Sequence, residues 1–240
     1  DNGELYSGWK DLTSDWRLYF DKDKQCAAAT GFNNISGSLY YFNKDGVMST
    51  GGTPVIDGKK YIIGSNGKIS IGWTKLSDSW IFYCNPNDNG AVLTGWNTIE
   101  KKDFYFDSNG LARFGFTSID GSIYYIDKEN GKYAGATVII DGKKYAFDGE
   151  GKQCFGWYTL GSWKMYFDPD NNGAAVTDSM IKDGIKYIFN SDGVLVETSA
   201  EAVKRKDPNS GRTYTLEGTF LTDPQIGIDV TEDEFFAAAV

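Results

Sequence analysis

The chain repeats itself, and the period of the repeat limits the possible folds more than any other feature of the sequence. The stretch IDGKKYIIGSNGKISIGW, residues 56–73, returns 84 residues later as IDGKKYAFDGEGKQCFGW, residues 140–157, with ten of the eighteen positions identical. A shorter period lies inside this echo, because a glycine preceded by Asn, Asp or Glu returns every 20 to 23 residues. These turn glycines are Gly46, Gly67, Gly90, Gly110, Gly131, Gly151, Gly173 and Gly193. Repeats of this length indicate stacked small units rather than one globular core.

Short aromatic strands are expected before the turn glycines, as in LYYF at residues 39–42 and IYYI at residues 123–126. Asn-Gly and Asp-Gly pairs accept the positive φ that a tight hairpin turn needs, so we place the hairpin turns at these glycines. After each turn, a second short strand usually leads to Gly and then an aromatic residue: Trp73, Trp96, Trp157, Phe32 or Phe116. One hairpin alone is marginal in water, so stability must come from stacking on its neighbours.

The eight turn glycines, together with a first unit whose turn DKDKQ lacks Gly, predict nine hairpin units of about 20 residues between Gly8 and about Thr198. Units two, three and four recur as units six, seven and eight, which indicates duplication of a block of four hairpins. We therefore predict an all-β solenoid over residues 1–198. Residues 199–240 are expected to form a C-terminal extension of short mixed or helical structure, which could be the start of a further module. A short helix or a linker is expected in SAEAVKRK, and a helix in TEDEFFAAAV.

Composition excludes several classes of function. The chain has no His, which removes the commonest general base and metal ligand, so we expect no enzyme activity, no metal and no cofactor. Cys26, Cys84 and Cys154 form no CxxC pair and are expected to be small buried residues. A net charge of −9 argues against nucleic acid as a partner. No run of 18 apolar residues exists, so no membrane insertion is expected.

The segments GSLYYFNKDGVMSTG and LGSWKMYFDPDNNGAAVTD resemble the cell-wall-binding, or choline-binding, repeats of secreted Gram-positive bacterial proteins. The same hairpin style occurs in clostridial toxin repeats and in the glucan-binding repeats of glucosyltransferases. The resemblance covers about residues 8–198. It implies a solenoid of stacked β-hairpins, a secreted and cell-wall-associated location, and fusion to other domains in the full-length protein.

In the choline-binding members of this family, the ligand lies between successive hairpins, against two aromatics of one hairpin and a third from the next. Aromatic faces attract a quaternary ammonium group through cation–π interaction. Three units carry both a Gly-Trp and a second Trp at the start of the aromatic strand, and the resemblance implies that each pair is completed by a Tyr of the following hairpin. The implied ligand-binding residues are Trp9, Trp16 and Tyr41; Trp73, Trp80 and Tyr105; and Trp157, Trp163 and Tyr187.

One departure from the family pattern concerns these strands. The family reads WYYF, whereas this chain reads WRLYF, WIFYC and WKMYF, which is one residue more between Trp and the last aromatic pair. An extra residue reverses the face on which a strand side chain lies. The alternative for these Trp rings is packing within the solenoid core.

The expected function is a non-catalytic module that attaches a secreted protein to a cell-wall polymer, either choline-decorated teichoic acid or another surface glycan. Several weak sites along one solenoid gain affinity for a repetitive polymer through tethering. Two alternatives stay open: a toxin- or adhesin-like module that binds host carbohydrate, and a structural spacer.

Overall fold

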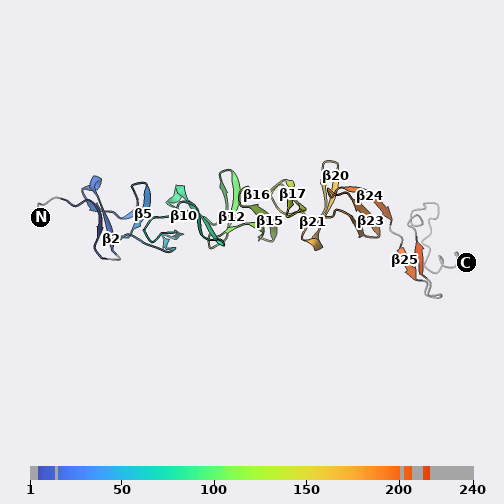
Figure 1. Cartoon of the computed structure of the whole chain (residues 1–240), viewed down its shortest axis with the longest axis horizontal. Helices are drawn as coiled ribbons and strands as arrows, with labels where there is room; N and C mark the ends of the chain where they lie inside the picture. The colour runs from blue at the N-terminus through green and yellow to red at the C-terminus, as the bar shows by residue number, and fades with distance from the viewer. Residues whose placement is uncertain (1–4, 14–15, 201–202, 207–212, 217–240) are drawn as a thin grey trace. The chain divides into compact units, whose positions relative to one another are not determined.

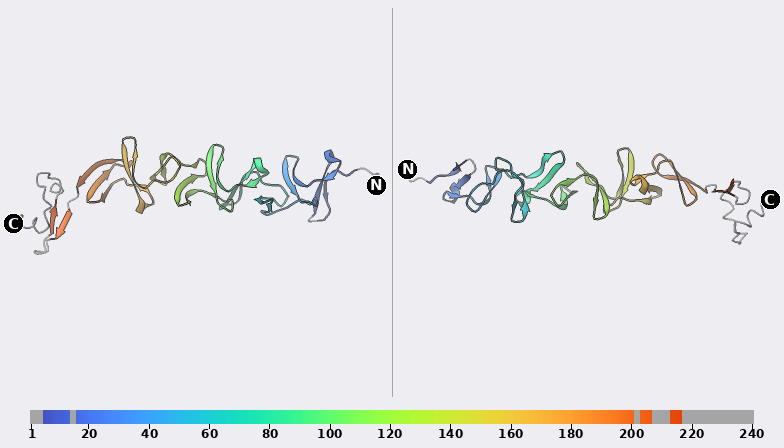
Figure 2. Two further views of the ribbon diagram at one scale, coloured as in Figure 1. Left: turned by 180° about the vertical axis from the view of Figure 1, so that it is seen from behind. Right: turned by 90° about the horizontal axis from the view of Figure 1, so that it is seen from below.

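The computed structural model describes residues 5–13, 16–200, 203–206 and 213–216 of the 240-residue chain. The described strand pairs are antiparallel, and the helical elements among these residues are three short 3-10 turns. Nine hairpins follow one another from Gly8 to Ala200 (Figure 1). Two further views show each hairpin as a small sheet of its own (Figure 2). The prediction of an all-β fold of about nine hairpin units is therefore confirmed.

The first five hairpins are built from β1 (Gly8–Asp11), β2 (Arg17–Asp21), η1 (Lys22–Lys24), β3 (Ala27–Ala28), β4 (Gly31–Ile35), β5 (Ser38–Phe42), β6 (Val55–Ile56), β7 (Lys59–Lys60), β8 (Gly72–Ser77), β9 (Trp80–Asn85), η2 (Pro86–Asp88), β10 (Ala91–Val92), β11 (Gly95–Ile99), β12 (Lys102–Phe106) and β13 (Ala112–Arg113). The remaining four are built from β14 (Gly115–Ile119), β15 (Ser122–Asp127), β16 (Gly131–Lys132), β17 (Ala136–Ile140), β18 (Lys143–Phe147), β19 (Gly156–Leu160), β20 (Trp163–Asp168), η3 (Pro169–Asn171), β21 (Ala174–Ala175), β22 (Ser179–Lys182), β23 (Ile185–Phe189) and β24 (Leu195–Ala200).

The principal turn of each hairpin precedes the aromatic strand, whereas the sequence predicted it after that strand, at the turn glycine. The Gly-Trp strand pairs directly with the aromatic strand, and most of the connecting turns have two residues with positive φ, such as Ser36 (51°) and Gly37 (77°) or Asp57 (49°) and Gly58 (79°). Two adjacent residues with positive φ make the turn whose twist matches that of paired strands.

The turn glycines have a different place from the predicted one. They keep the predicted positive φ, from 74° at Gly131 to 86° at Gly151, but they follow the aromatic strand and lead to a third strand. This third strand has six residues in the last unit (β24) and is short in the others. In three units it is reduced to a single bridge: Phe42 to Met48, Ile63 to Ile69 and Phe147 to Gln153. Each unit is therefore a hairpin with a third segment, which is short in all but the last.

One position recurs in the core of almost every hairpin. Near the end of the aromatic strand, eight hairpins have a side chain that is at most 4% exposed: Phe42, Ile63, Cys84, Phe106, Ile126, Phe147, Phe167 and Phe189. Cys84 takes the place of Phe in this series, and burial raises the pKa of its thiol. Cys26 and Cys154 are only partly buried, so the expectation of three buried cysteines is wrong for these two.

The chain divides into two compact units, each of which stacks its own hairpins. The first contains Asp1–Thr117 and Tyr125–Lys132, and the second contains Ser118–Tyr124 and Tyr133–Val240, so the boundary runs through the hairpin of β14 and β15. In the first unit, Trp9 and Tyr19 of one hairpin pack on the buried cluster of the next. The predicted boundary at residue 198 stays a prediction.

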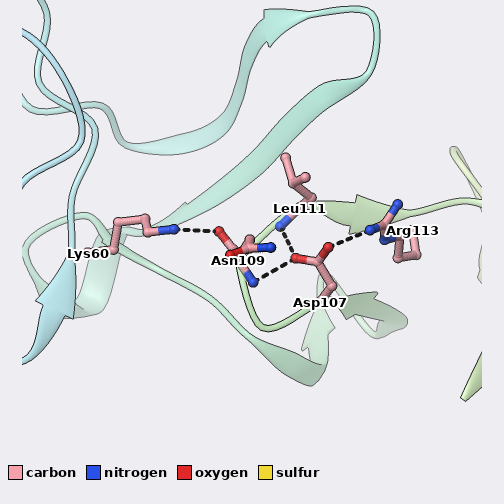
Figure 3. Close-up of polar contacts among 5 residues, drawn as sticks. All are labelled: Lys60, Asp107, Asn109, Leu111 and Arg113. Carbon is pink, nitrogen blue, oxygen red and sulfur yellow. Dashed lines mark hydrogen bonds and ion pairs between the residues drawn. The ribbon is translucent and has the colours of Figure 1, made fainter.

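Lysines of the DGKK hairpins hold the turns of later hairpins within each unit. Lys60 Nζ donates to the backbone oxygen of Asn109 at 2.9 Å, and the turn that carries Asn109 is closed by Asp107 (Figure 3). The Asp107 carboxylate accepts from the backbone N–H groups of Asn109 (2.8 Å) and Leu111 (2.9 Å) and from Arg113 (2.5 Å). The duplicated copy repeats the contact, since Lys144 Nζ donates to the backbone oxygen of Asp192.

Part of the predicted helix in the C-terminal extension is wrong. Within SAEAVKRK, residues up to Ala200 continue β24, and Val203–Lys206 form β25, which pairs with β26 (Thr213–Leu216). The helix predicted in TEDEFFAAAV lies outside the described residues. In the part of the chain that the structure describes, no helix has the length and apolar character needed to cross a membrane.

Candidate aromatic ligand site

The Trp of each Gly-Trp unit faces a Tyr on the paired strand, because the two residues are direct partners in the strand register. Trp9 is opposite Tyr19, Trp73 is opposite Tyr83, and Trp157 is opposite Tyr166. Cross-strand partners lie on the same face of a hairpin. The ring centroids of these pairs are 5.1, 5.3 and 5.2 Å apart.

The next hairpin adds two rings to each pair. Trp9 lies 5.0 Å from Tyr40 and 5.9 Å from Phe42. The equivalent distances are 5.0 Å to Phe104 and 5.8 Å to Phe106 for Trp73, and 4.8 Å to Tyr187 and 6.2 Å to Phe189 for Trp157. We call these three groups the Trp9, Trp73 and Trp157 ring sets, each defined by the Trp, its cross-strand Tyr and the two rings of the next hairpin.

The second Trp of each predicted pair lies elsewhere. Trp80 is three residues before Tyr83 on β9, and an odd separation places it on the opposite face, that of the buried Phe82. Trp16, Trp80 and Trp163 are 56, 56 and 57% exposed. Among the described residues, the two Trp rings of each predicted pair make no contact with each other. The structure therefore does not bring these pairs together.

Of the three predicted third rings, only Tyr187 contacts its expected Trp. Tyr41 instead lies 4.9 Å from Phe32, and Tyr105 lies 5.2 Å from Trp96. The neighbouring residues Tyr40 and Phe104 take the predicted places, because adjacent strand residues face opposite sides.

Sequence reasoning missed the cross-strand Tyr residues, Tyr19, Tyr83 and Tyr166. For Tyr166 the signal is the two-residue turn between the Gly-Trp strand and the aromatic strand, because that turn sets the register that pairs Trp157 with Tyr166. No such simple signal exists for the other two: β1 ends at Asp11 and β2 begins only at Arg17, and a register shift between Lys75 and Ser77 sets the pairing of Trp73 with Tyr83.

Cations of the protein itself lie over several of these rings. Arg17 Cζ is 4.6 Å from the Trp9 ring centroid, and Lys164 Nζ is 4.4 Å from that of Trp157. A third cation, Lys132 Nζ, lies 5.0 Å from the Trp96 centroid. Arg17 also pairs with Asp11 at 3.1 Å. The ring faces therefore already serve as cation sites within the chain.

A separate groove of about 430 Å³, with both polar and apolar lining residues, lies in the first unit beside the DGKK hairpin. Its charged groups are already engaged: Lys59 pairs with Asp88 at 2.7 Å, which raises the pKa of Lys59, and Lys60 donates to Asn109. No aromatic ring lines this groove. The described residues contain no group of three or more His, Cys, Asp or Glu placed to hold a metal ion.

Asp168, the first residue of the sequence DPDNNG, has a structural role in the turn. Its carboxylate accepts from the backbone N–H of Asp170 at 3.0 Å and caps η3.

Two family models match parts of the chain. The model described as choline-binding repeat matches residues 93–137, and a cell wall binding repeat matches residues 30–48. Among solved structures, CbpJ from Streptococcus pneumoniae is similar with a TM-score of 0.62 at 21% identity, over 80% of this chain and 72% of that chain. Choline binding protein F from the same organism, in the presence of a peptidoglycan analogue, has a TM-score of 0.63 at 21% identity, over 81% and 72%. These likenesses show a shared fold.

The curated relatives are longer enzymes. Glucosyltransferase-S of Streptococcus mutans is 28% identical over 229 residues, which is 91% of this chain and 14% of that protein. Glucosyltransferase-I of Streptococcus downei is 29% identical over 254 residues, which is 92% of this chain and 16% of that protein. The chain thus spans only a small part of the length of the curated relatives it matches.

Proposed function

We propose that this chain, which carries the repeats of the cell-wall-binding, choline-binding-like family, is a non-catalytic module that binds a polymer of the bacterial surface. The polymer is a choline-decorated teichoic acid or another surface glycan. In this proposal the module is secreted, stays associated with the cell wall and holds the domains fused to it at that surface.

The recurrence of the Trp ring sets carries the proposal. Each set presents a Trp, its cross-strand Tyr and two rings of the next hairpin with centroids within about 6 Å of the Trp. A quaternary ammonium group over such a set gains roughly 0.5–2 kcal/mol per ring, depending on how far it is desolvated. The Arg17 and Lys164 contacts support this chemistry, because they place a cation on equivalent rings.

A second candidate is binding of a glucan or another carbohydrate, including one on a host surface. The three strand Trp residues, Trp16, Trp80 and Trp163, favour it, since each is more than half exposed at the end of a hairpin. Exposed Trp rings offer flat apolar faces on which sugar rings stack, with an indole N–H for hydrogen bonding. The similarity to two glucosyltransferases over nine-tenths of this chain supports the same candidate.

One experiment separates the two candidates by pairing each ring type with its own resin. The chain would be applied to a choline resin and to an insoluble glucan. Two double variants are compared. The first carries Trp73→Ala and Trp157→Ala, and the second, its matched control, carries Trp80→Ala and Trp163→Ala. Loss of choline-elutable retention in the first pair alone supports the ring sets. Loss of glucan retention in the second pair alone supports the carbohydrate candidate.

Failure of the unaltered chain to be retained on either resin would contradict both candidates and leave the spacer alternative. The proposal that the module is not an enzyme has its own test. Release of soluble products from peptidoglycan or glucan by the chain alone would contradict it.

A further inference from the structure

We infer that residue 81 makes the Trp73 ring set the one that accepts an external organic cation, while Arg17 and Lys164 occupy the Trp9 and Trp157 ring sets from within. This inference rests on the proposed function, because it assigns that function to one ring set. The ligand class is a small quaternary ammonium group such as the choline head group.

Strand register places the internal cations. Lys164 lies two residues before Tyr166 on β20, so its side chain leaves the same face as Tyr166 and the opposite Trp157. Arg17 has the same relation to Tyr19 on β2 and reaches Trp9. Both cations come from the residue directly after the strand Trp.

The equivalent residue in the Trp73 unit is Ile81, two residues before Tyr83. It carries no charge, and no described Lys or Arg lies over the Trp73 ring. The exposure of the three Trp side chains agrees with this difference. Trp73 is exposed, at 43%, whereas Trp9 and Trp157 are less exposed and belong to the half-buried residues.

Two other lysines near the Trp73 ring set do not cover the Trp73 face. Lys75 is on the Trp73 side of β8 but pairs with Asp78 at 2.6 Å. Lys128 Nζ lies 5.8 Å from the centroid of Phe114, a ring outside the Trp73 set whose centroid is 6.2 Å from that of Trp73. Neither lysine lies over the Trp73 ring itself.

An internal cation lowers the affinity for an external one in two ways. The ligand must displace the side chain from the ring, and any positive charge left nearby repels it. Lys132 over Trp96 shows that a Lys from a different hairpin can cover a ring in the same way. In this inference a cation over the Trp ring itself closes a set, and Ile81 leaves the Trp73 ring without such a cation.

Calorimetric titration with choline chloride tests the inference on the full chain. The unaltered chain is expected to bind about one equivalent. Ile81→Lys is expected to weaken binding about tenfold or more, since it adds the missing internal cation. Ile81→Met is the control, because it keeps an apolar side chain of similar size. Lys164→Ile is expected to open the second set and raise the binding toward two equivalents.

Lys182→Ile controls for the general loss of a positive charge, since Lys182 is an exposed lysine of β22 with no described ring beneath it. Thermal melting of each variant confirms that the hairpins still fold. One equivalent in the unaltered chain, lost in Ile81→Lys and doubled in Lys164→Ile but not in Lys182→Ile, would support the inference.

Equal choline binding by the unaltered chain, Ile81→Lys and Lys164→Ile would overturn the inference and leave the proposed function intact. Choline binding by Lys164→Ile but not by the unaltered chain would also overturn it, because the Trp73 set would not be open. Retention on glucan without choline binding in any variant would overturn the inference while the binding function survives through the carbohydrate candidate. Failure on choline and on glucan alike would reject both together.

Discussion

At the scale of single residues, this chain has two kinds of Trp, which lie on opposite faces of their hairpin. Trp73 contacts Tyr83 and the buried rings Phe104 and Phe106, whereas Trp80 faces the other side and is 56% exposed. Trp73→Ala is expected to lower the free energy of unfolding by about 2 kcal/mol, less than for a fully buried Trp because the ring is partly exposed. Trp80→Ala should lower it by less than about 1 kcal/mol. Urea unfolding of both variants measures the difference. Equal losses of unfolding free energy would contradict the placement of Trp73 and Trp80 on opposite faces of the hairpin.

The identity of the ring residues could be predicted from the sequence, but their facing could not. Tyr40 and Tyr41 are adjacent and chemically alike, and only the register with the preceding strand decides which of them meets Trp9 and which meets Phe32. The extra residue in WKMYF was visible as a departure. The face on which Trp163 lies depends on the hairpin turn that precedes it, whereas the sequence predicted the turn after the aromatic strand.

The turn carboxylate Asp107 gives a pH prediction at the same scale. Partial burial acts to raise its pKa, but the backbone N–H groups of Leu111 and Asn109 and the Arg113 guanidinium outweigh burial and hold the pKa below its ordinary value. A lowered folded-state pKa means that the carboxylate stabilises the fold above its unfolded pKa of about 3.9. That stabilisation is lost as the pH falls through the folded-state pKa.

Asp107→Ala should therefore lower the free energy of unfolding at pH 7 by about 1–2 kcal/mol and flatten its fall in acid. Asp107→Asn is the matched control, because Asn43 and Asn190 accept the same backbone bonds in their own turns. It should lose less than about 1 kcal/mol at pH 7. Urea unfolding between pH 2.5 and 7 distinguishes them, and an unchanged acid slope in Asp107→Ala would refute the assignment.

At the scale of the element, turn glycines contact the preceding hairpin closely. A Cβ at Gly110 would lie 2.3 Å from Val92 Cγ1, whereas a Cβ at Gly37 would meet no atom within 4 Å, although both residues have positive φ, 82° and 77°. The two substitutions to Ala share the backbone penalty of about 1–2 kcal/mol. Gly110→Ala should lose roughly 2 kcal/mol more, since overpacking adds to the strain. Chemical denaturation compares them, and equal losses would show that the neighbouring hairpin yields freely.

The number and spacing of the hairpins could be predicted from the sequence, but not which of the two turns in each unit joins the paired strands. A polar residue followed by a glycine with positive φ occurs at both kinds of turn, so local turn chemistry alone does not say whether Gly37 or Gly46 closes the principal hairpin. Packing decides: Gly46 lies against Ala28 of the preceding unit, a contact between residues distant in sequence, while Gly37 closes the paired strands β4 and β5.

At the scale of the whole molecule, the 84-residue echo accounts for features that recur in both compact units. Lys60 and Lys144 hold later turns in the same way, and the Trp73 and Trp157 ring sets share one arrangement. Duplication predicted this equivalence from the sequence. It could not predict the difference between Ile81 and Lys164, since the effect of that residue on a ring depends on the strand register.

Stability in such a chain should be a sum of hairpin terms and contacts between near neighbours, so damage at one turn should stay local. The equivalent glycines Gly90 and Gly173 test this, one in each unit. A Cβ would lie 2.6 Å from Ser70 O at Gly90, and 2.4 Å from Gln153 Nε2 at Gly173. Gly90→Ala is expected to speed amide hydrogen exchange in β8, β9 and the flanking hairpins but not in β19 and β20. Gly173→Ala should show the reverse pattern. Because each variant is the control for the other, faster exchange along the whole chain in both would mean that the hairpins unfold as one cooperative unit.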